Sequence, residues 1–343
     1  MPARSPPPAR PPTVIHRTRL VVVLSFLSFL ACTTSPEASQ VAPEAPAETA
    51  PETAPDATPG ASPDASTGAS TGASPGSPAI LAADIQAHVD YLASDEMAGR
   101  GARTPEARVA ADYIAAQLAG SGVEPLGDDE TWFQTVDEEL APNVVGIVRG
   151  QEPGFVVISA HYDHLPPLES GDDRIFNGAD DNASGVAAVL EVGAALGALE
   201  TPPRRSIVLV AFTAEELGLR GAYHFVANPP LPLDELLGNL NMDMISRGEE
   251  NLLFCEAGKG AEALLEAVRR ANETVGLDIR YGEHPRWIRQ SDQYAFVRAG
   301  HPALYFGVED HEDYHRVSDH ADKILPGLAA SVAQLVYLTA TSL

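Results

Sequence analysis

The hydrophobic pattern of this chain alternates between helical and strand-like spacing after residue 79. Apolar residues recur every three to four positions over 80–92 and 103–118, which predicts two helices with one apolar face. The run 206–212 (SIVLVAF) is almost continuously apolar, as a strand buried on both faces requires. We expect further strands over 143–148, 155–160, 240–245, 252–255 and 303–307, and further helices over 186–199, 215–226, 261–275, 291–299 and 324–338.

Strands that alternate with helices are typical of a largely parallel sheet covered on both faces. We therefore predict an α/β fold, a single three-layer domain over 80–343 with a central mixed, largely parallel β-sheet flanked by helices. The runs 143–148 and 155–160, separated by Gly150 and Gly154, are expected to form a hairpin or neighbouring strands. In sheets of this kind, functional sites form where strands end.

The composition before residue 80 differs from that of the rest of the chain. Several arginines precede the apolar run 20–31, and Cys32 follows it, which predicts an export signal over 1–32. The apolar run is too short for a membrane-spanning helix. Residues 28–32 (SFLAC) resemble a bacterial lipobox. This resemblance predicts a cell-envelope lipoprotein that meets a membrane only through a lipid on Cys32, with ordinary secretion as the alternative.

Residues 33–79 consist almost wholly of Ala, Pro, Ser, Thr, Gly and acidic residues, without an aromatic or basic side chain. Such a segment cannot bury enough apolar surface to offset its ordering entropy, so we expect a disordered tether. The remaining 264 residues, 80–343, are enough for one domain with a sizeable core.

Charge and cysteine content exclude some functions. Residues 80–343 carry 42 Asp and Glu against 18 Lys and Arg, a formal net charge of −24 at pH 7. Nucleic acids and anionic membrane surfaces are therefore not expected partners. Cys32 and Cys255 are the two cysteines of the sequence, and a lipid on Cys32 would preclude a disulfide between them.

Two adjacent carboxylates, Asp180 and Asp181, occupy the Gly-rich turn NGADDNASG (177–185) at the entrance to a predicted helix. Like charges this close repel, and no Lys or Arg lies beside them in the sequence. A bound cation would offset the repulsion. The alternative is a structural helix cap, in which Asp181 or Asn182 accepts backbone N–H groups.

Other carboxylates and imidazoles lie at or just past the ends of predicted strands, and a further His lies in a late segment. A set of His, Asp and Glu without Cys suits zinc, manganese or cobalt. Two divalent ions about 3.5–4 Å apart need a bridging carboxylate and terminal ligands on each side. Asp181 would be the bridging carboxylate. Glu215, the neighbour of the terminal ligand Glu216, would be free to act as a general base. The terminal ligands would be His161 with Asp243 on one ion, and Glu216 with His315 on the other.

Five short motifs occur in one register along the chain: HxDH at 161–164, GADDNASG at 178–185, EE at 215–216, NMDM at 241–244 and YHxxSD at 314–319. In order and approximate spacing they closely resemble the M28 metallopeptidases, the di-zinc aminopeptidase family. The resemblance extends from about residue 80 to the C-terminus and includes YLASDEMAGR and NVVGIVRG.

The resemblance implies a role for each position. Glu215 would take a proton from the attacking water and pass it to the leaving amine. Tyr314 would polarise the scissile carbonyl and stabilise the oxyanion. Asp163 would orient the imidazole of His161. The implied zinc ligands are His161 and Asp243 for one ion, Glu216 and His315 for the other, and Asp181 for both; Asp180 would support the bridge, and Asp319 the loop that presents His315.

Some alternatives remain open. His164, His311 and His320 are other candidate imidazoles, and His311 with His315 would imitate a zinc pair if a helix joined them. The acidic segment 310–313 lacks a helical pattern, which favours His315 alone.

The chain also departs from the family pattern at one point. Many relatives have Ser-Asp-His where this chain has Ser291, Asp292 and Gln293, so an imidazole is absent from the expected rim of the site. Arg289 would lie near the substrate end or form a surface salt bridge.

The sequence therefore predicts a zinc-dependent exopeptidase, an aminopeptidase that uses two Zn²⁺ to hydrolyse N-terminal residues from peptides outside the cytoplasm. Its partner would be a peptide with a free N-terminus, which acidic residues near an open end would attract. One alternative is another hydrolase or transferase of the same fold, such as a carboxypeptidase or a one-zinc glutaminyl cyclase. The other is a non-catalytic peptide-binding domain, which would be expected to have lost a ligand or the base.

Overall fold

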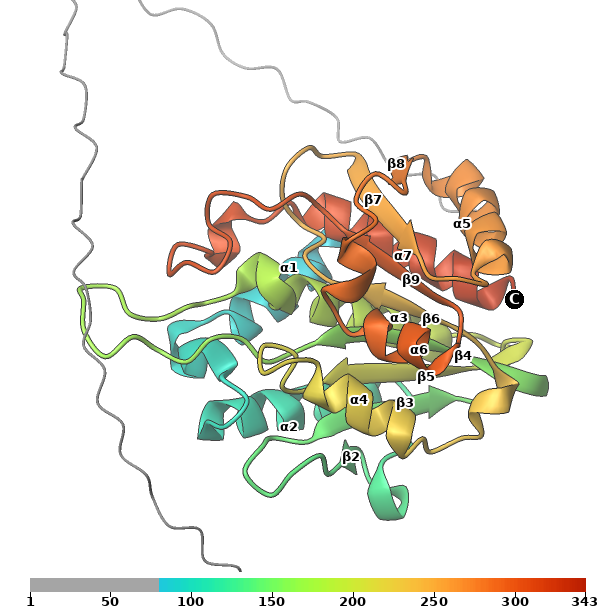
Figure 1. Ribbon diagram of the computed structural model, residues 1–343, viewed down its shortest axis with the longest axis horizontal. Coiled ribbons are helices and arrows are strands. Elements are labelled where there is room, and N and C mark those ends of the chain that lie inside the picture. Colours follow the sequence, from blue (N-terminus) through green and yellow to red (C-terminus); the bar gives the residue numbers. More distant parts are fainter. Residues whose placement is uncertain (1–79) are drawn as a thin grey trace, which may run out of the picture. The chain divides into compact units, whose positions relative to one another are not determined.

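The computed structural model describes residues 80–343 (Figure 1). The predicted export signal over 1–32, with its lipid on Cys32, and the predicted tether over 33–79 lie outside the described residues. Within 80–343, none of the helices is both long and apolar enough to cross a membrane.

A nine-stranded sheet forms the centre of the described part. Its strand order is β1-β3-β5-β4-β6-β9-β7-β8, and β2 pairs with β3 outside this order. The central strands β5, β4, β6 and β9 are parallel, whereas β3 and β7 join them antiparallel. The predicted α/β fold with a mixed, largely parallel sheet is confirmed. The bounds are β1 (Glu124–Pro125), β2 (Phe133–Gln134), β3 (Asn143–Val148), β4 (Glu152–His161), β5 (Arg205–Phe212), β6 (Leu236–Met242), β7 (Leu252–Ala257), β8 (Asp278–Tyr281) and β9 (Ala303–Gly307).

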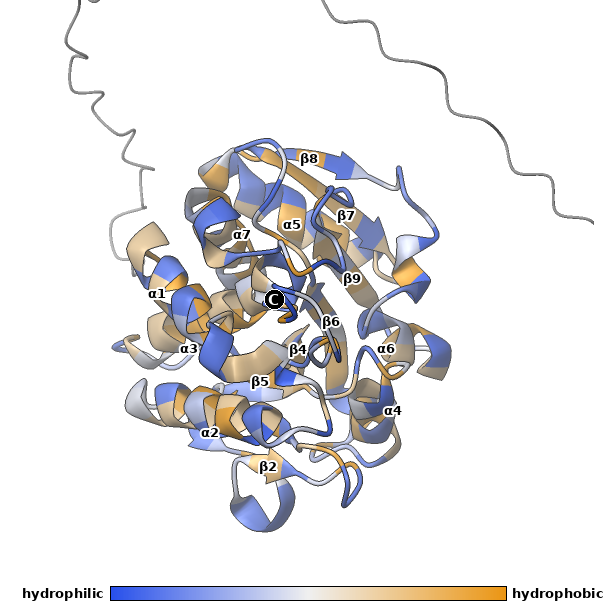
Figure 2. Ribbon diagram, turned by 90° about the vertical axis from the view of Figure 1, so that its left-hand side faces the viewer, coloured by the Kyte–Doolittle hydropathy of each residue, from blue (hydrophilic) through white to orange (hydrophobic). Residues whose placement is uncertain are grey.

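Helices cover both faces of the sheet, which lies between them in Figure 2. Helices α1, α2, α3, α5 and α7 pack over the larger core, and α4 and α6 over the smaller core, where Phe212, Phe225 and Phe296 meet. The bounds are α1 (Ala82–Leu92), α2 (Pro105–Gly120), α3 (Gly185–Gly197), α4 (Arg220–Ala227), α5 (Glu262–Val275), α6 (Gln293–Ala299) and α7 (Pro326–Thr341), with short helical turns η1 (Asp95–Arg100), η2 (Asp128–Glu130), η3 (Ala179–Ser184), η4 (Leu233–Glu235), η5 (Trp287–Arg289) and η6 (Ala321–Lys323).

The prediction that the runs now seen as β3 and β4 are a hairpin or neighbours is wrong. β5 lies between them, antiparallel to β3 and parallel to β4. The short link from β3 to β4 crosses the start of β5, where the Gln151 N–H donates to the carbonyl of Arg204 at 3.1 Å. Gly150 is required at this crossing because a Cβ would lie 2.2 Å from the backbone of Arg205.

The helix predicted over 215–226 begins only at Arg220. Ala214 and Leu219 have φ angles of 55° and 59°, in the left-handed region that ends a right-handed helix. The segment between them is a loop, so Glu215 and Glu216 are held at the end of β5 instead of on a helix face. The pattern missed β1, β2 and β8, which span only two to four residues each and are too short for a periodic signal.

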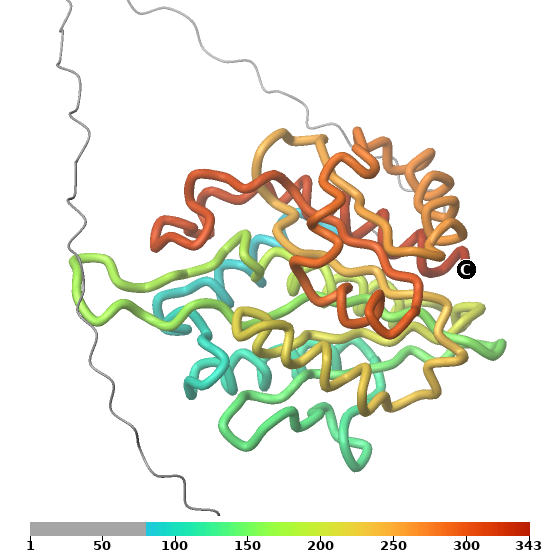
Figure 3. The backbone as a smooth tube through the Cα atoms, in the orientation of Figure 1, coloured from blue at the N-terminus to red at the C-terminus, as the bar shows by residue number. Residues whose placement is uncertain are grey.

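The parallel centre of the sheet decides where the predicted site residues lie. β4, β5 and β6 are neighbours, so the residues that follow them emerge at one edge of the sheet. The loops after β4 and β9 project from this same edge, on the left of Figure 3.

A buried guanidinium holds the loops at this edge together. Arg100, at the end of η1, is 0% exposed and donates to four main-chain carbonyls. The acceptors are Leu92 (2.6 Å), Tyr162 (2.9 Å), Asn177 (2.7 Å) and Gly178 (2.9 Å). Burial lowers the pKa of Arg100 to about 10, so it stays charged at neutral pH. It therefore ties the exit of β4 to the turn that precedes Asp181.

Replacing Arg100 by Lys should destabilise the protein although the charge is kept. An ammonium cannot reproduce the planar fork that reaches four carbonyls, and each buried acceptor left unpaired costs about 1–3 kcal/mol. We expect the free energy of unfolding, measured by urea denaturation, to fall by at least about 2 kcal/mol. Arg108→Lys is the matched control, since Arg108 also donates to a carbonyl, that of Leu140, but is exposed. Equal effects of the two substitutions would contradict this role for Arg100.

Candidate metal centre

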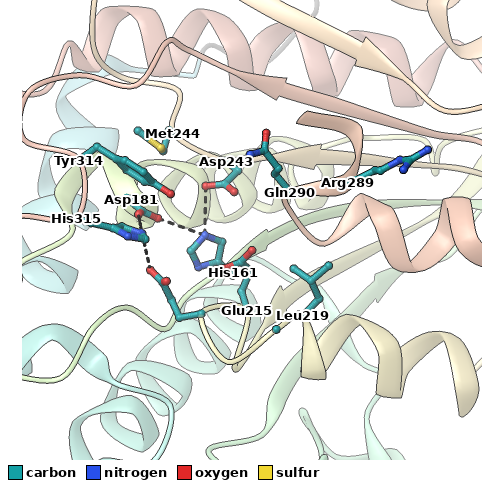
Figure 4. A pocket seen from close by; sticks show the side chains of 12 residues that line it. His161, Asp181, Glu215, Leu219, Asp243, Met244, Arg289, Gln290, Tyr314 and His315 are labelled. Atoms are coloured by element: carbon teal, nitrogen blue, oxygen red, sulfur yellow. Dashed lines mark hydrogen bonds and ion pairs between the residues drawn. The ribbon is translucent and has the colours of Figure 1, made fainter. Parts of the chain in front are cut away.

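The ends of three parallel strands and two loops line a pocket of about 330 Å³ (Figure 4). β4 and β6 supply a residue at or directly after their last position, and the loop after β5 supplies a pair. Turn η3, the long loop after β9, and η5 with Gln290 supply the other lining residues. The structure thus brings together all the residues predicted to bind metal or to take part in catalysis: His161, Asp181, Glu215, Glu216, Asp243, Tyr314 and His315.

We call His161, Asp181 and Asp243 the first cluster. The Nε2 atom of His161 lies 3.4 Å from Oδ1 of Asp181 and 3.2 Å from Oδ1 of Asp243. One potential ligand atom from each residue lies within 4.8 Å of the others, so the three can reach one ion. All three residues are buried.

We call His164, Asp181, Glu216 and His315 the second cluster. His315 Nε2 lies 3.1 Å from Oδ2 of Asp181 and 3.4 Å from Oε1 of Glu216. His164 Nδ1 lies 2.8 Å from the same Glu216 oxygen and 3.7 Å from Asp181. The structure therefore places His164 beside Glu216 as well as the predicted ligand His315. The two imidazoles differ in exposure, since the His315 side chain is 38% exposed and that of His164 is 0% exposed.

Asp181 belongs to both clusters, one carboxylate oxygen facing each. Burial alone would raise its pKa, but the imidazoles of His164, His161 and His315 outweigh burial and hold the pKa of Asp181 well below its usual value. Burial likewise opposes ionisation of Glu216, whose pKa is lowered to about 2 by His164 and His315. The carboxylates of Asp181 and Glu216 are therefore ionised at neutral pH, as metal binding requires.

The imidazole of His161 is oriented from behind by a main-chain group. Its Nδ1 lies 3.0 Å from the carbonyl oxygen of Asp163 and 3.9 Å from the carboxylate of that residue. The carboxylate instead accepts a hydrogen bond from the backbone N–H of Glu215 at 3.1 Å. Asp163 therefore supports two site residues at once, His161 through its carbonyl and Glu215 through its side chain.

Asp180 and Asp319 hold the turn that presents Asp181. Oδ1 of Asp180 accepts from the N–H and the hydroxyl of Ser246, both at 2.7 Å. Oδ2 of Asp319 accepts from the N–H groups of Asp180 and Asp181 at 3.0 and 3.2 Å. Asp319 thus supports the predicted bridging residue directly, in addition to lying in the loop of His315.

The alternative function of the Gly-rich turn, a helix cap, is performed by Asn182. Its Oδ1 accepts from the N–H of Gly185, the first residue of α3, at 3.0 Å. Asp181 has no such cap bond and turns its carboxylate toward the imidazoles. Gly178 is required before it, since its φ is 56° and a Cβ would lie 2.5 Å from the ring of His164.

A second network holds the loop that carries Tyr314 and His315. Arg247 donates to Asp313 at 2.6 Å and to Asp319 at 3.4 Å. Lys323 donates to the other oxygen of Asp313 at 2.8 Å. These contacts connect the end of β6 with both sides of the loop.

Glu215 lies in a different electrostatic environment from its neighbour Glu216. Burial raises its pKa well above the usual value, and the carboxylates of Asp243 and Asp292 add to the effect, against the opposing charge of His161. Asp292 is buried, and neither of its carboxylate oxygens has a hydrogen-bond partner. A carboxyl group with a raised pKa is suited to holding and releasing a proton.

Two tyrosines contact residues of the clusters, and one of them was not expected from the sequence. Tyr314 is 37% exposed and stacks on His315, with ring centroids 4.0 Å apart. Tyr305 lies on β9 and donates from its hydroxyl to the carbonyl of Asp243 at 3.0 Å. This contact could not be predicted from the sequence, because a tyrosine within a predicted strand is more often a core residue. Arg100 was missed because an arginine in a polar segment is expected at the surface, whereas here it is buried.

The remaining candidate imidazoles lie apart from the two clusters. His311 Nε2 is 3.2 Å from Oδ2 of Asp180, a residue that belongs to neither cluster. His320 lies 3.8 Å from Asp173 and is 40% exposed. No helix joins His311 to His315 in the structure of residues 80–343.

Gln293 is not at the rim where the sequence analysis expected it. It is 0% exposed, at the first position of α6, and its side-chain amide forms hydrogen bonds inside the protein. Arg289 does line the pocket and forms no surface salt bridge within the described residues.

The donor set fits divalent metal ions. Nitrogen and carboxylate oxygen ligands without sulfur suit zinc and similar ions, and the two clusters share a carboxylate as a pair of ions would need.

Comparison with known proteins agrees with this geometry. Aminopeptidase YwaD of Bacillus subtilis is 32% identical over 149 residues, which is 41% of this chain and 30% of that protein. The solved structure of BSAP, a zinc aminopeptidase from Bacillus subtilis, has a TM-score of 0.60 at 18% identity, covering 76% of this chain and 94% of that one. A Bacteroides thetaiotaomicron glutaminyl cyclase also has a TM-score of 0.60 at 18% identity, covering 78% and 99%. The fold alone therefore does not select between these activities.

The chain spans 30%, 53% and 65% of the length of three curated relatives that it matches. The family model described as peptidase family M28 matches residues 143–340, more than half of the chain. This match contains every strand end that lines the pocket. The chain therefore belongs to peptidase family M28.

Proposed function

We propose that this protein is an aminopeptidase that uses two divalent metal ions, zinc in the first instance, to release N-terminal residues from peptides. The observation that carries the proposal is the position of Asp181. Its two oxygens face separate clusters, each with at least one imidazole and one further carboxylate. His161 and Asp243 would hold one ion, Glu216 and His315 the other, and Asp181 would hold both.

The protein residues divide the chemistry among them. Bound ions would supply Lewis-acid polarisation of the scissile carbonyl and acidify an attacking water. Glu215 would accept the proton of that water and return it to the leaving amine. The N–H of Glu215 is bound by Asp163, which holds the backbone of Glu215 at the pocket that its side chain lines. Tyr314, which lines the pocket, would donate a hydrogen bond to the developing oxyanion.

The charge of the pocket favours a protonated N-terminus over a C-terminal carboxylate beside the metals. Glu215, Glu216 and Asp243 contribute carboxylates around the two clusters. A free α-amino group would be held by such a surface while its adjacent carbonyl reaches the ions. The alternative of a non-catalytic binding domain is disfavoured because no predicted ligand and no base is missing from the pocket.

Glu215→Gln should abolish turnover while both metals stay bound. A base that transfers a proton stabilises the transition state and does not contribute to coordination. We expect kcat to fall by at least about a hundredfold, with two zinc ions per chain by elemental analysis. Loss of metal together with activity would show that Glu215 is a ligand and that its assignment is exchanged with Glu216.

The second imidazole ligand can be identified by metal stoichiometry. His315→Gln should reduce bound zinc from two ions to about one per chain, because His315 is the proposed imidazole ligand of the second ion and His164, 3.7 Å from Asp181, is not expected to replace it. His320→Gln is the control and should retain two ions, since His320 lies outside both clusters. Loss of an ion in His164→Gln but not in His315→Gln would assign the ligand to His164.

Acetylation of the substrate N-terminus tests the direction of cleavage. The acetyl group removes the charge that the carboxylates would bind, and a charge-assisted contact is worth about 1.5–3 kcal/mol, or roughly ten- to a hundredfold in kcat/KM. We expect an N-acetylated peptide to be hydrolysed more slowly by at least that factor than the free peptide. Comparable rates, or release of residues from the C-terminus, would reject the aminopeptidase proposal; cyclisation of an N-terminal glutamine would favour the cyclase alternative.

A further inference from the structure

The wall of the pocket remote from His315 is formed by η5 and Gln290. Figure 4 shows Gln290 and Arg289 on one side of the pocket and Tyr314 with His315 on the other. This wall supplies no metal ligand. It would therefore face the part of a substrate that extends away from the reacting carbonyl.

Arg289 is the only Lys or Arg among the residues that line this pocket, where four carboxylates also lie. Its side chain is exposed, and its guanidinium has no hydrogen bond or ion pair with any residue of 80–343. A free guanidinium in a chain with such an excess of acidic residues is available to a ligand. Its planar fork matches a carboxylate in two hydrogen bonds.

The backbone that carries Arg289 is fixed by aromatic packing. Trp287 stacks on His284 with centroids 3.9 Å apart and an angle of 11° between the rings. The edges of Phe254 and Tyr305 also contact Trp287, at 5.6 and 5.8 Å between centroids. Tyr305 in turn donates to the carbonyl of Asp243, a residue of the first cluster. The wall is thus built onto the metal centre.

Gln293 fixes the same wall from inside the protein. Its Nε2 donates to the carbonyl of Trp287 at 2.8 Å, and its Oε1 accepts from Nδ2 of Asn241 at 2.9 Å. Asn241 lies on β6, two positions before Asp243. The buried amide therefore joins the turn that carries Arg289 to the strand that presents a predicted ligand.

We propose that Arg289 binds a carboxylate of the peptide substrate and gives this pocket a preference for acidic or very short peptides. The proposal rests on the proposed peptidase function. The amine would lie among the carboxylates at the metal end and the carboxylate at the η5 end. A pocket of about 330 Å³ holds only a few residues, so the carboxylate belongs to a side chain next to the scissile bond or to the C-terminus of a dipeptide.

Binding to the zinc-loaded Glu215→Gln protein tests the proposal without turnover. Calorimetry would compare three matched pairs of ligands: Glu-Ala-amide with Gln-Ala-amide, Leu-Glu-amide with Leu-Gln-amide, and Leu-Ala with Leu-Ala-amide. In at least one pair the carboxylate ligand should bind roughly tenfold more tightly, as expected for a charge-assisted contact. The pair that shows the advantage identifies the source of the carboxylate.

The additional substitution Arg289→Gln should remove that advantage, and Arg289→Lys should retain part of it because the charge remains without the fork. Arg286→Gln is the matched control, since Arg286 is an exposed arginine directly before η5 that does not line the pocket. Zinc can itself bind carboxylates, but that contribution is common to the protein with and without Arg289 and cancels in the comparison.

An equal preference for carboxylate ligands with and without Arg289 in all three pairs would overturn the proposal, as would a loss of the preference in Arg286→Gln. Wild-type protein should show the same preference in kcat/KM. If the ligands bind in an Arg289-dependent way but wild-type protein releases no N-terminal residue, the carboxylate site stands and the proposed aminopeptidase function fails.

Discussion

The site is organised by the need to keep several buried carboxylates close together. Burial and mutual repulsion oppose ionisation of each, yet the pKa of Asp181 is held low while that of Glu215 is raised. The difference follows from position, because imidazoles surround Asp181 and carboxylates surround Glu215. Lys and Arg are absent from the two clusters. The buried charge of Arg100 acts on Asp181 and Glu216 from behind, and divalent ions would supply further positive charge within the clusters.

Much of the support for these side chains comes from the main chain. The carbonyl of Asp163 orients His161, and Arg100 binds four carbonyls on the segments around it. Backbone N–H groups of Asp180 and Asp181 are held by Asp319. Because these contacts use loop backbones, the positions of the ligands depend on loop conformation more than on the packing of the helices.

The sequence predicted the parts of the structure that follow from periodicity and from strand ends. The long helices, the buried strand SIVLVAF and the meeting of His161 with Asp243 belong to this class, since parallel neighbours must end at one edge. The order of the strands in the sheet could not be predicted in this way, because the placement of β5 between β3 and β4 depends on contacts between residues remote in sequence. The loop at Glu215 and the inward position of Gln293 depend on local backbone angles and on burial, which residue pattern does not encode.

The two walls of the pocket are built by different means, and this difference bears on how specificity would arise. The metal-facing wall comes from strand ends, whose geometry the sheet fixes. The opposite wall is a short turn held by the packing of Trp287 and by the amide of Gln293, both away from the clusters. Substitution at Arg289 would change the charge of that wall without moving a predicted ligand. Preference for a substrate would therefore vary independently of metal binding, because neither Arg289 nor the turn that carries it supplies a predicted ligand.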